Sequence, residues 1–269
     1  SSAMQQSLFR HALEVGRRYN IDCKSRCKRP SPLLAMEYKL MDKMVLRLVR
    51  KQIGLENAHL FPTAGATVSP AVERFTHSVG INMVVGYGLT ESLATVSCDR
   101  EDMPYTIGSV GRPINGLEVK IGENDEILLK GPTITPGYYK RDAINKEAFT
   151  EDGFFRTGDA GYIKNGELFL TDRIKDLFKT SNGKYIAPQM IESLLLVDKF
   201  IDQVAIVANE RKFVSALIVP EFRLVEEWAK DHGIAFESRE ELCANPKVHK
   251  MMMDRIQTLQ QQLAHYEQI

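Results

Sequence analysis

The spacing of apolar residues changes along this chain, and it predicts which segments form helices and which form strands. In residues 7–19, and again in residues 33–53, apolar positions recur every three to four residues, which is the interval of an amphipathic helix. The apolar stripe expected in the second helix consists of Leu40, Met44, Leu48 and Ile53. Each helix is therefore predicted to pack one face against a protein core.

A loop of small residues, a helix and an apolar strand follow in that order. Residues 61–70 form the loop, Ser69 is of a type favoured at a helix N-cap, and Pro70 suits the first helical position. The helix leads to the apolar run 81–85. This order predicts a parallel α/β sheet, in which ligands bind at the carboxyl ends of the strands.

Beyond Pro113 the pattern is that of short antiparallel strands. Residues 117–121 and 126–130 flank a turn, and residues 162–164 and 167–170 flank an Asn-Gly pair, which is a strong hairpin signal. The remaining predicted elements are a hairpin of 204–208 with 214–220, a helix over 224–230, and a last helix that runs from Asn245-Pro246 to Ile269. The last helix has no glycine or proline stop, so we expect the chain to end within a domain.

Composition places the chain among globular proteins. Its 269 residues are 43% hydrophobic and 26% charged, which suits one large or two ordinary domains. Its 35 Lys and Arg balance its 35 Asp and Glu, so there is no global field that would attract nucleic acid. The chain contains no P-loop, HExxH or Gly-x-Ser-x-Gly motif, which counts against the corresponding nucleotide and hydrolase chemistries.

A basic run between residues 17 and 29 is the main local departure from this balance. It consists of Arg17, Arg18, Lys24, Arg26, Lys28 and Arg29, with Asp22 among them. We interpret it as a solvated helix end and loop, with contact to acidic lipid as the alternative. The sequence shows no bilayer-spanning apolar stretch and no signal-peptide pattern, which predicts a cytoplasmic location, the alternative being peripheral contact with the inner face of the membrane.

The heptapeptide Gly86–Ser92, directly after the apolar strand, carries the most specific chemistry. Glycines at 86 and 88 let the backbone turn sharply and approach a ligand closely. The Thr90 hydroxyl can donate to a phosphate oxygen, and the Glu91 carboxylate can hold Mg²⁺. Taken alone, the same residues also fit an ordinary glycine-rich turn after a strand.

Four segments, read together, favour a ligand-binding loop over an ordinary turn. They are Thr63–Pro70, Gly86–Ser92, Phe155–Asp159 and Asp172–Lys179. In this order and spacing they resemble the adenylate-forming enzymes, which include acyl-CoA synthetases, peptide-synthetase adenylation domains and luciferases. Residues 179–188, 215–220 and 226–230 resemble the long-chain fatty acyl-CoA synthetases in particular, and the resemblance covers nearly the whole chain.

The resemblance implies a multidomain α/β fold. Residues 1–174 would be the C-terminal part of the large AMP-binding domain, with an α/β part (1–100) and a β-rich subdomain (101–171). Residues 175–269 would be a mobile, truncated small domain. The implied activity joins a long-chain fatty acid to AMP with ATP and Mg²⁺, and then transfers the acyl group to CoA, because AMP is a far better leaving group than oxide.

The resemblance also assigns roles to individual residues. Gly65, Ala66 and Thr67 would line the adenine, Tyr87 would stack on it, and Gly86 and Gly88 would lie beneath the nucleotide. Thr90 would touch the α-phosphate, Glu91 would bind Mg²⁺, and Asp159 would accept hydrogen bonds from the ribose. Arg173, Lys175 and Lys179 would approach the nucleotide from the small domain, with Lys175 as hinge and catalytic residue, and Gly183, Lys184 and Tyr185 would face the CoA channel. In isolation, Asp159 could instead cap a turn, and Arg173 could pair with Asp172 or Asp176.

Departures from the family pattern lead to a further expectation. The family's phosphate-binding loop would precede Ser1 and its C-terminal lysine would follow Ile269, so we expect this chain alone to be unable to form acyl-AMP. Asp172 and Thr63-Ala64 also stand where glycine is more usual. Two alternatives stay open: adenylation of another acid with a carrier protein as acceptor, and a nucleotide-binding or scaffolding module without catalysis.

Overall fold

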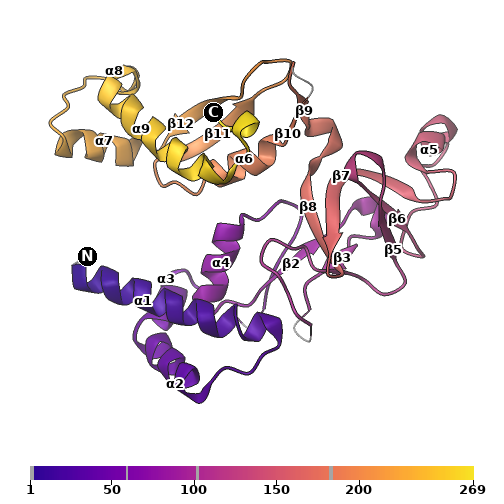
Figure 1. The fold of residues 1–269 in the computed structure, drawn as a ribbon, viewed down its shortest axis with the longest axis horizontal. Helices are drawn as coiled ribbons and strands as arrows, with labels where there is room; N and C mark the ends of the chain where they lie inside the picture. Colours follow the sequence, from indigo (N-terminus) through magenta and orange to yellow (C-terminus); the bar gives the residue numbers. More distant parts are fainter. Residues whose placement is uncertain (1–2, 59, 101–102, 182–183) are drawn as a thin grey trace. The chain divides into compact units, whose positions relative to one another are not determined.

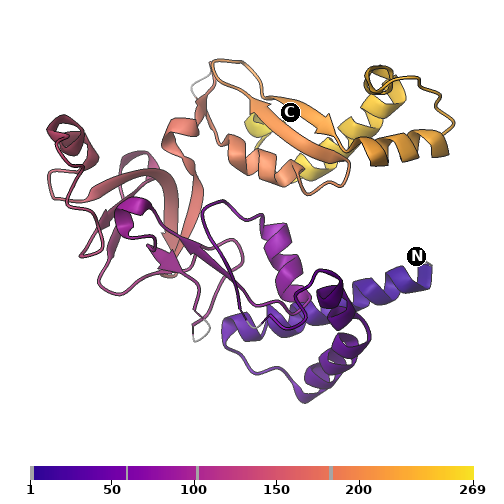
Figure 2. The same ribbon diagram turned by 180° about the vertical axis from the view of Figure 1, so that it is seen from behind.

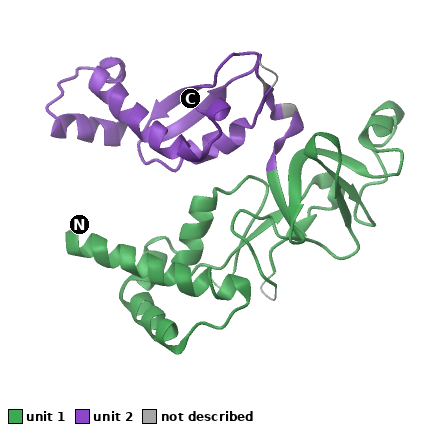
Figure 3. Cartoon of the chain, viewed as in Figure 1, with its two compact units in different colours: residues 1–170 green, residues 171–269 purple. Residues whose placement is uncertain are grey.

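The computed structural model describes residues 3–58, 60–100, 103–181 and 184–269, excluding the side chains of Lys175 and Lys179. The chain divides into two compact units, residues 1–170 and 171–269 (Figure 3). Each unit has its own buried apolar clusters. None of the described helices combines the length and the apolar character that crossing a membrane would require.

The first unit begins with a layer of helices (Figure 1). These are α1 (Ala3–Asn20), α2 (Pro32–Met41), a π-helical turn η2 (Asp42–Leu46), α3 (Arg47–Gln52) and α4 (Pro70–Ser78). Gly16 lets α1 approach α4 closely, because a Cβ at that position would lie 1.9 Å from the Ser78 carbonyl oxygen. As predicted, the Ser69 hydroxyl caps α4 by accepting from the Ala71 N–H, and Pro70 begins the helix.

The predicted apolar stripe of the second helical segment is wrong. Leu40, Met44, Leu48 and Ile53 are each about half exposed. The residues that pack against α1 and the start of the sheet are instead Leu34, Met41 and Leu46, with Tyr38, Val45 and Val49 beside them. Apolar residues occupy both faces of this segment, and the π turn shifts the buried face by one residue. A prediction that assumes one constant helical period therefore chose the exposed face.

A four-stranded sheet in the order β1-β2-β3-β4 follows the helical layer. Its strands are β1 (Phe61–Thr63), β2 (Met83–Tyr87), β3 (Ser97–Cys98) and β4 (Arg112–Pro113). Strands β1 and β2 are parallel and are connected through α4, as the sequence predicts, whereas β3 and β4 add antiparallel strands. The loops that leave the carboxyl ends of β1 and β2 therefore emerge at the same edge of the sheet.

The second sheet of this unit has the order β5-β6-β7-β8. Its strands are β5 (Glu118–Ile121), β6 (Glu126–Lys130), β7 (Phe155–Lys164) and β8 (Glu167–Arg173), and α5 (Asp142–Ala148) lies in the β6–β7 connection. Both predicted hairpins are confirmed, and Asn165 and Gly166 adopt the positive φ values of 54° and 78° that a tight hairpin turn requires. One apolar cluster, with Val85, Leu129 and Leu168 among its members, joins the two sheets.

The second unit is built around the antiparallel hairpin of β11 (Ile201–Val207) and β12 (Ser215–Pro220), with α6 and α9 packed on it (Figure 2). Its other elements are η5 (Ile174–Asp176), β9 (Phe178–Lys179), β10 (Tyr185–Ile186), α6 (Pro188–Leu195), α7 (Phe222–Asp231), α8 (Arg239–Ala244) and α9 (Pro246–Leu259). The predicted hairpin and the helix at 224–230 are confirmed.

The predicted extent of the last helix is wrong. Asn245 caps α9 as expected, but the helix ends at Leu259 and two short 3-10 turns, Gln260–Gln262 and His265–Glu267, follow. Gln260 is buried, and its side-chain amide bonds both the N–H and the carbonyl of Ile269. The chain folds back on itself because this buried amide binds a distant backbone segment.

Candidate active site

The loops that follow β1 and β2 meet at one cavity of about 570 Å³. Its lining brings together Ala64, Gly65, Gly88, Leu89, Thr90, Leu93 and Ala94. A second cavity of about 250 Å³ shares Ala64 and Ala94 with the first and is lined by Gly86 and Tyr87 among others. Ala66 and Thr67 are exposed on the same β1–α4 loop but are not among the described residues that line either cavity.

The shape of the first cavity depends on close backbone packing at Gly88. A Cβ at Gly88 would lie 1.5 Å from the Ala94 carbonyl oxygen, so only glycine fits. Leu93 and Ala94 have positive φ values of 51° and 78°, a conformation that costs free energy in residues other than glycine. The buried Ser92 side chain holds the turn, because its hydroxyl accepts from the Leu89 N–H and donates to the Leu89 carbonyl.

Thr90 and Glu91 lie in a 3-10 turn, η3 (Thr90–Ser92), with Thr90 exposed at the cavity. The Tyr138 hydroxyl donates to Glu91 Oε1 at 2.8 Å, and the Thr135 N–H donates to the Glu91 backbone carbonyl at 2.7 Å. Burial, together with the adjacent Glu91 carboxylate, raises the pKa of Tyr138, so its hydroxyl stays protonated as a donor. The other carboxylate oxygen of Glu91, Oε2, has no hydrogen-bond partner among the described residues.

Tyr87 and Asp159 connect the two sheets directly. The Tyr87 hydroxyl donates to Asp159 Oδ2 at 2.6 Å, and both residues are buried. Asp159 lies in the middle of β7, where the Thr157 hydroxyl accepts from its backbone N–H. A carboxylate predicted to face the nucleotide is thus hydrogen-bonded to a tyrosine of the glycine-containing heptapeptide.

The remaining predicted site residues belong to the second unit. Arg173 ends β8, and its N–H donates to Asp172 Oδ1 at 2.7 Å. Lys184 Nζ lies 5.6 Å from the centroid of the Tyr266 ring, and Tyr185 begins β10 with an exposed side chain. Lys175 lies in η5 and Lys179 in β9, but their side chains are outside the described part of the structure, as is the whole of Gly183.

Sequence reasoning missed two residues that shape this site, Ser92 and Tyr138. Ser92 belongs to the heptapeptide, and its position three residues after Leu89 is the spacing of a side chain that closes a turn. Tyr138 is 47 residues from Glu91, so no local pattern could pair them. The only local signal is its place after Pro136-Gly137 in a polar loop, where an aromatic residue needs a partner.

Several solved structures share this fold. The chain superimposes with a TM-score of 0.63 on the adenylation domain of a carboxylic acid reductase from Segniliparus rugosus in complex with AMP and a carboxylic acid, at 22% identity over 96% of this chain and 39% of that one. It also matches O-succinylbenzoate CoA synthetase from Bacillus subtilis in complex with ATP and magnesium, with a TM-score of 0.59 and 20% identity over 89% of this chain and 49% of that one. The α/β fold is that of part of an adenylate-forming domain, as predicted.

Sequence comparisons agree with the structural ones. Residues 26–139 match the family model described as AMP-binding enzyme. Among curated relatives, the long-chain-fatty-acid–CoA ligase FadD15 of Mycobacterium bovis is 31% identical over 211 residues, which cover 77% of this chain and 35% of that protein. The predicted resemblance is confirmed, and the chain spans about a third of the length of the relative it matches.

Proposed function

We propose that this chain is part of a ligase that activates a long-chain fatty acid with ATP and transfers it to CoA. The fatty acid carboxylate attacks the α-phosphorus of ATP, which gives acyl-AMP and pyrophosphate. The CoA thiol then displaces AMP and forms the thioester. The observation that carries the proposal is the convergence of Gly65, Gly88 and Thr90 on one cavity beside the Tyr87–Asp159 pair.

The nucleotide would occupy this region of the first unit. Gly65, Ala66 and Thr67 would contact the adenine through their backbone, and Tyr87 would stack on it. Gly86 and Gly88 leave room beneath the nucleotide. Asp159 would accept hydrogen bonds from the ribose hydroxyls, for which a carboxylate suits because it has acceptors only. Thr90, exposed at the cavity, would donate to the α-phosphate.

Glu91 fits a magnesium ion. Mg²⁺ in nucleotide sites takes one or two carboxylates and completes its shell with phosphate oxygens and water. The Tyr138 hydroxyl binds Oε1 of Glu91 and so fixes the orientation of the carboxylate. Oε2, the oxygen that would ligate the ion, is oriented with it. When bound, the ion would neutralise charge on the phosphate groups.

The second unit would supply the remaining groups. We propose residues 1–174 as the C-terminal part of the AMP-binding domain and residues 175–269 as a small domain that turns about Lys175. Arg173, Lys175 and Lys179 would contact the ribose and phosphates. Gly183, Lys184 and Tyr185 would border the CoA channel after the turn.

Ligand binding by the chain itself tests the nucleotide site. In calorimetric titrations with AMP, we expect Asp159→Asn to weaken binding about tenfold, because a charge-assisted hydrogen bond to the ribose becomes a neutral one. Asp142→Asn, at an exposed position of α5, is the matched control and should change nothing. Equal affinities of wild type and Asp159→Asn for AMP would contradict the assignment of the ribose site.

The variant Glu91→Gln distinguishes the proposed metal site from the proposed adenine site. We expect this variant to lose affinity for ATP in the presence of Mg²⁺ while its affinity for AMP without Mg²⁺ is unchanged. The substrate class is tested in the enzyme that contains this chain, by pyrophosphate release with palmitate, a short acid and an aromatic acid, and with CoA or a carrier protein as acceptor. Preference for an aromatic acid, or for a carrier protein, would overturn the fatty acyl-CoA assignment but leave the adenylate-forming one intact.

A further inference from the structure

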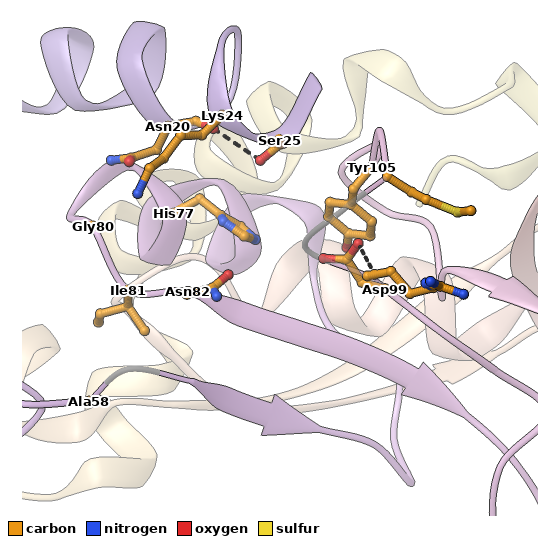
Figure 4. A pocket seen from close by; sticks show the side chains of 12 residues that line it. Asn20, Lys24, Ser25, Ala58, His77, Gly80, Ile81, Asn82, Asp99 and Tyr105 are labelled. Carbon is orange, nitrogen blue, oxygen red and sulfur yellow. Dashed lines mark hydrogen bonds between the residues drawn. The ribbon is translucent and has the colours of Figure 1, made fainter. Parts of the chain in front are cut away.

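A separate pocket of about 430 Å³ lies at the opposite end of β2 from the candidate active site. It is bordered by the C-terminal end of α1, the turn η1 (Lys24–Arg26), the end of α4 and the residues just before β2. None of the described residues that line it lines either cavity of the candidate active site. Figure 4 shows Asn20 and Lys24 above His77, with Asn82 below it and Tyr105 and Asp99 to the side.

His77 presents an unused acceptor to this pocket. It is 5% exposed, and its Nε2 has no partner in the described part of the chain. Burial, the larger effect, lowers the pKa of His77, and a hydrogen bond to the Met83 backbone raises it, as an accepting carbonyl does. Because Nε2 has no partner among the described residues, we assign this bond to the Nδ1–H, which leaves the lone pair of the ring on Nε2. A buried acceptor without a donor is costly, and a hydroxyl in the pocket would satisfy it.

Two cationic side chains and one carboxylate belong to the described lining of the pocket. Lys24 and Arg100 both line it and are both exposed. Arg17 is held by Glu14 and Asp22, but Lys24, Arg26, Lys28 and Arg29 have no ion pair within the described residues. Among the described residues of the lining, Asp99 is the one carboxylate. The basic run noted in the sequence therefore supplies one cation, Lys24, to the described lining of a polar cavity.

We propose that this pocket binds a phosphomonoester that carries hydroxyl groups, such as a polyol or sugar phosphate. Lys24 and Arg100 hold the phosphate, and a ligand hydroxyl donates to His77 Nε2. A phosphomonoester carries a charge of about −1.5 to −2 at neutral pH, which matches two cationic side chains better than a carboxylate does. The polar lining, with the Asn20 and Asn82 amides and the Asp99 carboxylate, suits the hydroxyl groups.

The test is a calorimetric titration with glycerol 3-phosphate at constant ionic strength, with the nucleotide site saturated by AMP. We expect one saturable site, and about tenfold weaker binding by Lys24→Gln because a charge-assisted hydrogen bond is lost. Lys28→Gln removes a charge from the same loop but does not line the pocket, so it should bind as the wild type does. His77→Leu should lower the preference for glycerol 3-phosphate over inorganic phosphate, and its circular dichroism reports whether it has folded.

Three outcomes would overturn the proposal: no saturable binding at millimolar concentration, saturable binding that occurs only when AMP is left out, or equal losses in Lys24→Gln and Lys28→Gln. The last would show diffuse attraction to the basic loop rather than a site. Binding to vesicles of phosphatidylcholine with and without phosphatidic acid shows whether the phosphomonoester belongs to a lipid. Binding to phosphatidic acid that Lys24→Gln removes assigns the site to a lipid headgroup, whereas binding of glycerol 3-phosphate alone assigns it to a free metabolite.

Discussion

Glu73, on α4, is a buried carboxylate of which only one oxygen has a hydrogen-bond partner among the described residues. It is 1% exposed, its Oε2 accepts from the Gly108 N–H at 2.7 Å, and its Oε1 has no partner among the described residues. Burial raises the pKa of Glu73 to about 7, and the nearby Asp99 adds to the shift. The Gly108 N–H and the Arg74 guanidinium oppose it. Loss of the proton from Glu73 therefore destabilises the folded chain.

The stability of the chain should consequently fall as the pH rises from about 4.5 to about 7. In that range the folded state keeps a proton on Glu73 that the unfolded state has lost, so the free energy of unfolding decreases with pH. The full decrease in the free energy of unfolding is on the order of 3 kcal/mol. We expect Glu73→Gln, which cannot ionise, to match the wild type at pH 5 and to exceed its free energy of unfolding at pH 8, as measured by urea denaturation.

The exposed Glu56 provides the control for this measurement. Glu56→Gln should follow the wild type at both pH values, because substitutions at exposed positions without special contacts change stability little. A Glu73→Gln variant that is less stable than the wild type by the same amount at pH 5 and pH 8 would show that the side chain is structural without titrating in this range.

Tyr138 should act as a positioning residue for Glu91. We expect Tyr138→Phe to weaken Mg²⁺-dependent ATP binding several-fold, because Glu91 loses the hydroxyl that orients its carboxylate. Binding of AMP without Mg²⁺ and thermal stability should be unchanged, since the Tyr138 side chain is only partly buried. Tyr139→Phe, at the adjacent and 85% exposed tyrosine, is the matched control for a titration over Mg²⁺ concentration. Equal Mg²⁺ dependence in the two variants would contradict the role of Tyr138.

Residue types in the heptapeptide could be predicted from the sequence, but their partners could not. The sequence predicts that a ligand approaches the backbone at Gly88, whereas the close neighbour in the structure is the Ala94 carbonyl of the chain itself. The bond from Tyr87 to Asp159 joins residues 72 positions apart, and the bond from Tyr138 to Glu91 joins residues 47 apart. Such contacts depend on how two sheets pack, and a pattern within one segment carries no information about them.

At the scale of elements, the segment α2–η2–α3 shows where periodicity fails. Its apolar residues lie on two faces, and the π turn between Asp42 and Leu46 changes the register between them. The hairpins were predictable because their turns have a local chemical requirement, such as positive φ at Asn165 and Gly166. The end of α9 was not, because it depends on the buried Gln260 amide and the distant Ile269 backbone.

Two leucines of this segment test which face is buried. Leu46 is fully buried among Val15, Leu34 and other apolar residues, whereas Leu48 is 57% exposed. We expect Leu46→Ala to lower the free energy of unfolding by about 3 kcal/mol through lost burial and a residual cavity. Leu48→Ala should change it by less than about 0.5 kcal/mol, as for other surface sites. Both are measured by chemical denaturation, and a larger loss from Leu48→Ala would restore the face predicted from the sequence.

At the scale of the whole molecule, the buried clusters follow the division into two units. The clusters that contain Leu46 and Leu129 consist of residues before position 171. Those that contain Ile191 and Val225 consist of residues after it. Because each unit buries its own apolar side chains, each satisfies the main physical condition for folding by itself. We therefore predict that the segment 171–269 folds when it is produced separately.

The second unit should then unfold independently of the first in the intact chain. Ile191 and Leu46 are both completely buried, in clusters that share no residue, so their effects should not be coupled. We expect Ile191→Ala to lower the melting temperature of one calorimetric transition and Leu46→Ala that of the other. The transition lowered by Ile191→Ala should be the one that the separate 171–269 segment reproduces. A single transition that both substitutions lower equally would show that the units fold as one body despite their separate cores, and a 171–269 segment without cooperative unfolding would show that its core needs the first unit.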